Sequence, residues 1–74
     1  MNNIRRKQLA KSIEKINEAI QYVTGVLEEE NEAFENIPEG LQESERGETM
    51  QECIDTLESM ISDFEDYVSQ LEDM

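Results

Sequence analysis

Apolar residues recur along the first half of the chain at alternating intervals of four and three positions. This spacing places them on one face of an α-helix, which completes a turn about every 3.6 residues. The pattern predicts a helix over residues 3–36. Glu30 interrupts it at a core-type position, where we favour a side chain that bends out to solvent over a functional buried acid. The apolar positions are Leu9, Ile13, Ile16, Ile20, Val23, Leu27, Phe34 and Ile37.

The helical pattern breaks at Pro38. A proline disfavours the helical conformation in the residue before it, and Gly40 tolerates turn geometry that other residues resist. We therefore expect a turn over residues 37–44, in which Leu41 folds back over the end of the molecule. Ser44 is the favoured N-cap of the next helix, and Thr49, which has the capping-box spacing to Glu52, is the alternative.

The second half of the chain repeats the same spacing without a gap and predicts a helix over residues 45–72. Two long amphipathic helices joined by a short turn pack antiparallel. The expected fold is therefore all-α, a coiled-coil-type helical hairpin that forms a single domain over residues 1–74. Two registers fit the spacing: Leu9 is covered by Val68 in one and overhangs beyond Met74 in the other. The apolar positions of the second helix are Met50, Ile54, Leu57, Ile61, Phe64, Val68 and Leu71.

The second helix carries a further apolar column, with residues seven positions apart: Cys53, Met60, Tyr67 and Met74. The first helix has a column of mostly small residues at the equivalent positions: Ser12, Ala19, Val26 and Ala33. The apolar face is thus wider than one partner helix can cover. We favour two hairpins that form a homodimeric four-helix bundle, in a docking direction that the spacing leaves open, over a monomer that leaves Met60 and Tyr67 partly exposed. The surface around Cys53, Met60 and Tyr67 is accordingly a candidate for self-association or for a partner helix.

Charge is distributed unevenly along the chain. The 19 acidic and six basic residues give a formal net charge of −13. All basic residues except Arg46 lie within the first fifteen positions, where an antiparallel hairpin would bring them near the acidic end of the second helix. The turn end then remains strongly negative, which favours a basic protein partner. Direct binding to nucleic acid or to an anionic membrane is not expected, because phosphate groups would be repelled.

Composition argues against an enzyme. The chain has no histidine, so Cys53 has no histidine to activate it, and neither a Cys/His zinc site nor a Glu-x-x-His di-iron site can be completed. We expect no catalytic, cofactor or metal site. A lone cysteine fits a reducing compartment, and no apolar segment follows the basic start to make a secretory signal. The expected location is the cytoplasm, here that of a bacterial host cell in view of the resemblance described next.

The turn and its flanks carry a distinctive run of residues: Asn36, Ile37, Pro38, Glu39, Leu41, Gln42, Ser44 and Arg46. This run resembles a junction, Asn-(Leu/Ile)-Pro-Glu-x-Leu-Gln-x-Ser-x-Arg, in small acidic helical-hairpin proteins from phages and prophages of Gram-positive bacteria. The resemblance covers roughly residues 28–73 and implies a phage-related origin without implying an activity. Physically, Gln42 and Ser44 can satisfy backbone groups around the turn.

Three functional hypotheses follow. The first is a phage-related inhibitor that mimics DNA and blocks the basic nucleic-acid-binding site of a host defence protein. The second is a helical module that blocks a partner's dimerisation through Cys53, Met60 and Tyr67, and the third is a structural or assembly accessory of a phage. For the first, carboxylates three, four and seven residues apart on a helix repeat every ~5 to 10 Å, comparable with phosphates along a strand. The candidate partner-binding residues are Glu52, Asp55, Glu58, Glu65, Asp66, Glu72 and Asp73.

Overall fold

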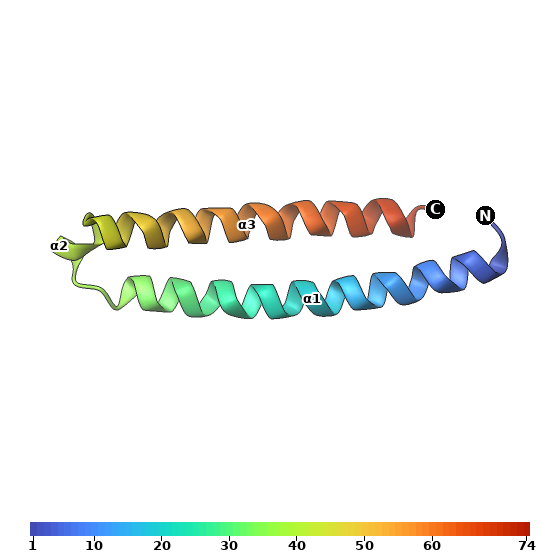
Figure 1. The fold of residues 1–74 in the computed structure, drawn as a ribbon, viewed down its shortest axis with the longest axis horizontal. Coiled ribbons are helices and arrows are strands. Elements are labelled where there is room, and N and C mark those ends of the chain that lie inside the picture. The colour runs from blue at the N-terminus through green and yellow to red at the C-terminus, as the bar shows by residue number, and fades with distance from the viewer.

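Two long helices lie side by side and are joined at one end by a short helical turn (Figure 1). The structure is a computed structural model that describes all residues from Met1 to Met74. Helix α1 spans Asn3–Glu35, α2 spans Glu39–Gln42 and α3 spans Glu45–Glu72. The molecule measures 58 × 15 × 13 Å, with both termini at the end opposite the turn. The predicted all-α, hairpin-like arrangement of two packed helices is confirmed.

The turn differs from the expectation in one respect. The short helix α2 occupies its centre, and the backbone N–H of Leu41 donates to the Pro38 carbonyl at 2.8 Å. Gly40 lies within α2, and no glycine in the chain has a positive φ angle. The expectation that Gly40 provides an unusual turn conformation is therefore wrong, because right-handed helical geometry completes the turn. Leu41 also departs from its expected role, since it is 55% exposed and does not cover the end of the hairpin.

Both long helices begin at a side-chain cap. The Asn2 Oδ1 accepts from the Arg5 backbone N–H at 2.8 Å, and the Ser44 hydroxyl accepts from the Gly47 N–H at 3.3 Å. Ser44 is thus the N-cap of α3, as expected. The alternative cap, Thr49, lies inside α3 and donates its hydroxyl to the Glu45 carbonyl at 3.0 Å.

The core is narrow and lies nearer to one edge of the apolar stripe of α3. Ile54 and Val68 are buried, at 3% and 6% exposure, whereas Phe64 on the neighbouring column is 38% exposed. The outermost apolar column is more open still, with Met60 at 44% and Tyr67 at 57%. Helix α1 contributes no fully buried residue. Exposure therefore rises steadily across the apolar face of α3, because α1 covers only one side of it.

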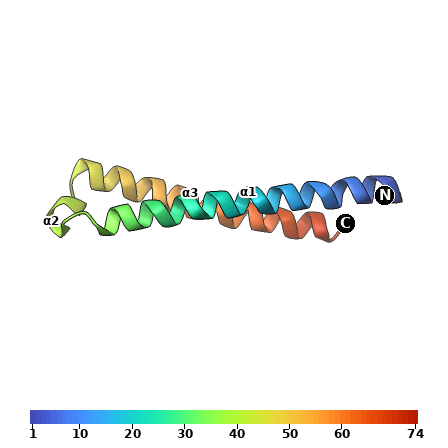
Figure 2. The same ribbon diagram turned by 90° about the horizontal axis from the view of Figure 1, so that it is seen from below.

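The register of the two helices leaves α1 longer at the open end. Residues Ile16 to Val23 share a groove with Phe64 and Tyr67. Since helices rise about 1.5 Å per residue, this pairing puts Leu9 about level with Met74 rather than with Val68, and Leu9 is half-buried there. The register therefore lies close to the second of the two expected ones, without a full overhang of Leu9. The first turns of α1 extend past the end of α3 in both views (Figures 1 and 2).

This overhang alters the expected charge pairing. In this register Arg5, Arg6 and Lys7 fall beyond Met74 and beyond the acidic residues that they were expected to approach, and only Lys11 and Lys15 fall level with the last turns of α3. The Arg6 side chain instead donates from Nε to the Met1 carbonyl at 3.1 Å.

Candidate interaction surfaces

The two flanks of the seam between α1 and α3 have different chemistry. On one flank lie the seven acidic residues named above, which we call the acidic face: Glu52, Asp55, Glu58, Glu65, Asp66, Glu72 and Asp73. All seven are exposed; six belong to α3 and Asp73 is its C-cap, so one helix and its cap fix their order and spacing. The Gln51 side chain orients one of them by donating to Asp55 Oδ1 at 2.9 Å. The structure thus arranges these carboxylates in a row rather than in a cluster.

This row does not form a metal-binding cluster. Nowhere in the chain do three or more His, Cys, Asp or Glu side chains come close enough together to hold a metal ion. Glu52 differs from the other members, because it also reaches the rim of a groove that contains Cys53 and Leu57.

The opposite flank is apolar and open, and we call it the apolar face. It combines the outer column of α3 with the column of smaller residues on α1: Cys53, Met60, Phe64, Tyr67, Ala19 and Val26. A groove of about 280 Å³ runs between the helices here, and all of its lining side chains are hydrophobic: Ile16, Ala19, Ile20, Val23, Phe64 and Tyr67. The sequence prediction that Met60 and Tyr67 extend beyond the reach of one partner helix agrees with their exposure.

A second groove of about 490 Å³ lies nearer the turn on the same flank. Val26, Cys53 and Leu57 form its apolar part, and Glu30 and Thr56 add polar groups. Glu30 is half-buried at this site, so its side chain lies at the boundary between core and solvent. Together the two grooves follow the seam along much of its length.

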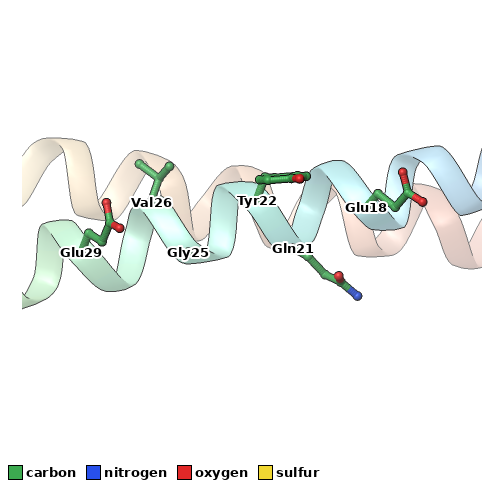
Figure 3. A pocket seen from close by; sticks show the side chains of 6 residues that line it. All are labelled: Glu18, Gln21, Tyr22, Gly25, Val26 and Glu29. Carbon is green, nitrogen blue, oxygen red and sulfur yellow. The ribbon is translucent and has the colours of Figure 1, made fainter.

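A third hollow, of about 500 Å³, is formed by α1 alone (Figure 3). Tyr22 and Val26 lie along one edge of the helix between Glu18 and Glu29, and Gln21 points away from them (Figure 3). Tyr22 is 81% exposed and was not singled out from the sequence, because it lies outside the repeating apolar positions. A surface formed by one helix excludes little water, so this hollow offers no enclosed site for catalysis.

The closed end contains a close contact between two backbone segments. Gly47 is buried, and a Cβ atom placed on it would lie 2.1 Å from the backbone oxygen of Gln42. The Gln42 side chain secures the same junction by donating from Nε2 to the carbonyls of Ile37, at 3.2 Å, and Phe34, at 3.4 Å. The role expected for Gln42 at the turn is thus observed, whereas that of Gly47 was not anticipated. One feature of the sequence could have indicated it: Gly47 lies seven residues before Ile54 and therefore on the same core column of the helix.

Comparison with protein-family models, with curated proteins and with solved structures finds no match to this chain. The helices also contain no stretch that combines the length and the hydropathy needed to cross a bilayer.

Proposed function

We propose that this protein is a small protein–protein interaction module, a phage-related inhibitor whose acidic face occupies the basic nucleic-acid-binding site of a host protein. The observation that carries the proposal is the exposed row of carboxylates on α3. Each side chain of the row is exposed, and helix α3 with its C-cap holds them at intervals comparable with DNA phosphates. A net charge of −13 would steer a basic partner toward the protein.

The test separates the acidic face from acidity in general. One variant neutralises five members of the face: Glu52→Gln, Asp55→Asn, Glu58→Gln, Glu65→Gln and Asp66→Asn. A control variant removes the same number of charges near the turn: Glu28→Gln, Glu29→Gln, Glu32→Gln, Glu35→Gln and Glu39→Gln. Each variant loses five negative charges from the original net charge of −13, so the two have equal net charges and a non-specific electrostatic effect would weaken binding equally in both.

Each protein is immobilised and exposed to a lysate of a Gram-positive bacterium, and bound proteins are eluted with duplex DNA and identified by mass spectrometry. We expect the unmodified protein and the turn variant to retain nucleic-acid-binding proteins that DNA displaces. The variant of the acidic face should lose at least about ten-fold of this capture, which corresponds to about 1.4 kcal/mol. Equal loss from both variants, or no DNA-displaced protein at all, would contradict the proposal.

The apolar face supports a second proposal, that two copies of the hairpin associate into a four-helix bundle. Ile54 and Val68 are the only buried apolar residues of the 74-residue chain, which is a small core for a protein of this size. Burying Met60, Phe64 and Tyr67 against a second copy would enlarge it. The alternative occupant, a helix of another protein whose own dimerisation is thereby blocked, would use the same grooves.

Sedimentation equilibrium distinguishes these occupants. We expect a dimer for the unmodified chain and a monomer for Met60→Glu, because the new carboxylate would be desolvated in the bundle. Ser59→Glu adds the same charge at the adjacent, exposed position and should leave the dimer intact. A monomeric unmodified chain would exclude self-association and leave the face available to a different helix.

A further inference from the structure

The distribution of charge along α1 bears on how two copies would dock. Arg5, Arg6, Lys7, Lys11 and Lys15 occupy its first half, and Glu28, Glu29, Glu30, Glu32 and Glu35 gather in its last two turns. This order is the reverse of the one that the helix dipole favours, since positive groups lie at its positive end and negative groups at its negative end. Helix α1 is therefore a strongly bipolar helix whose own backbone does not compensate its charges.

Helix α3 does not compensate the acidic half of α1 either. The part of α3 beside that half begins with Glu45 and Glu48 in its first turn and has Arg46 as its one basic residue. At the other end, the first turns of α1 project past the end of α3 (Figure 1), and this part of the chain contains Arg5, Arg6 and Lys7. Each hairpin thus concentrates its negative charge at the turn, where Arg46 alone opposes it, whereas at the open end the basic residues of α1 offset the acidic residues of the last turns of α3.

We infer that two hairpins dock through their apolar faces with their turns at opposite ends of the bundle; this inference rests on the proposed homodimer. In this arrangement α1 of one copy runs antiparallel to α1 of the other, so the basic half of each meets the acidic half of its counterpart. Docking with both turns at the same end would bring the two acidic clusters together, well separated from the basic residues. The 58 Å length of the hairpin far exceeds the screening distance of about 8–10 Å at physiological salt, so charge at one end cannot offset charge at the other.

The smaller residues of α1 fit the same arrangement. Ser12, Ala19, Val26 and Ala33 are symmetric about the midpoint between Tyr22 and Val23, as the residue numbers show. A two-fold axis through this point sets Ala19 against Val26 of the second copy, and Ser12 against Ala33 of the second copy. Small side chains along a helix allow two backbones to approach closely, so the α1 pair can form the tight seam. The larger and more flexible Met60 and Tyr67 side chains then fill the space between the two α3 helices.

Distances between spin labels distinguish the two docking directions. In a Cys53→Ser background, a single label is attached through Glu43→Cys at the turn, where the native side chain is exposed. With the axis at the middle of α1, a rise of about 1.5 Å per residue predicts a separation of roughly 55 Å between the two labels. Docking with both turns at one end would instead bring the labels within about 30 Å, given that the hairpin is only 15 Å wide.

A second label position provides the control. Ser59 is exposed and lies near the middle of α3. Two labels attached through Ser59→Cys, one on each copy, should therefore be within about 40 Å of each other in either direction of docking. A long distance at the turn together with a shorter one at the middle supports docking with opposed turns. Short distances at both sites would overturn the direction while preserving the dimer. Absence of any inter-label distance, with a monomer in sedimentation, would overturn the dimer itself.

Discussion

The closed end and the open end of the hairpin are formed by the same two helices, yet they are held together differently. At the closed end, Gln42 bridges to the carbonyls of Phe34 and Ile37, and Gly47 allows α3 to begin against the backbone of Gln42. At the open end, α1 continues past α3, and Ile4 is 70% exposed. The comparison shows that specific backbone contacts fix the geometry of the turn, whereas only the overlap of apolar side chains holds the opposite end.

The largest effect is expected from Gly47→Ala. The added methyl group would lie 2.1 Å from the Gln42 oxygen and 2.6 Å from its carbonyl carbon, and both are backbone atoms that cannot rotate away. Overpacking of this kind costs about 1–3 kcal/mol or more, so we expect a loss of about 3 kcal/mol in the free energy of unfolding. Urea denaturation followed by circular dichroism would measure it.

Gly25→Ala is the matched control for that substitution. Gly25 also lies within a long helix, and a Cβ atom there would meet nothing within 4 Å. Alanine should therefore stabilise the protein by about 0.5–1 kcal/mol through its better helix propensity. If both alanine variants shifted the unfolding midpoint in the same direction, close packing at Gly47 would not be the cause of its effect.

Gln42→Ala should have an intermediate effect. Its amide donates to two backbone carbonyls that end α1 and begin the turn, and the alanine variant would leave both without this partner. We expect a loss of about 1–2 kcal/mol, because both bonds are partly buried. Gln42→Glu removes the donor and keeps the size of the side chain, so it should destabilise at least as much. Unfolding curves of both variants that overlay the original would contradict this role.

The two helix caps provide the smallest comparison. Ser44→Ala removes the cap of α3 at the closed end and should cost about 1 kcal/mol of global stability. Asn2→Ala removes the equivalent cap of α1, but on turns that project beyond α3. Because a fraying terminus contributes little to the global transition, we expect a loss of only a few tenths of a kcal/mol. Amide hydrogen exchange should show the same contrast, with faster exchange before Leu9 than after Ser44.

How much of this could be predicted from sequence depends on the range of the interactions involved. Regular spacing from Leu9 to Ile37 and from Met50 to Leu71 gave helix bounds within one residue of those observed, because each turn repeats the same local signal. The four-residue helix α2 was missed, since it is scarcely longer than a single turn. Gly47 was overlooked because its constraint comes from a backbone atom of Gln42, which no propensity encodes.

For the candidate surfaces too, local spacing predicted some features and the packing of the two helices determined the others. Spacing alone placed Cys53, Met60 and Tyr67 together in one column, and the structure finds all three exposed. The spacing could not show which side of the apolar stripe of α3 would be covered by α1, because that depends on the angle at which the two helices meet. The exposure of Tyr22 likewise depends on how far the packed stripe extends around α1, which only the assembled hairpin reveals.

Cys53 gives the apolar face a chemical reporter without any substitution. It is the only cysteine of the chain, it is exposed in the single hairpin, and it lines the groove with Val26 and Leu57. Any molecule that covers this groove would shield the thiol from a small alkylating reagent. The rate of alkylation therefore measures how much of the face is occupied, and its dependence on protein concentration tells a second copy apart from a different occupant.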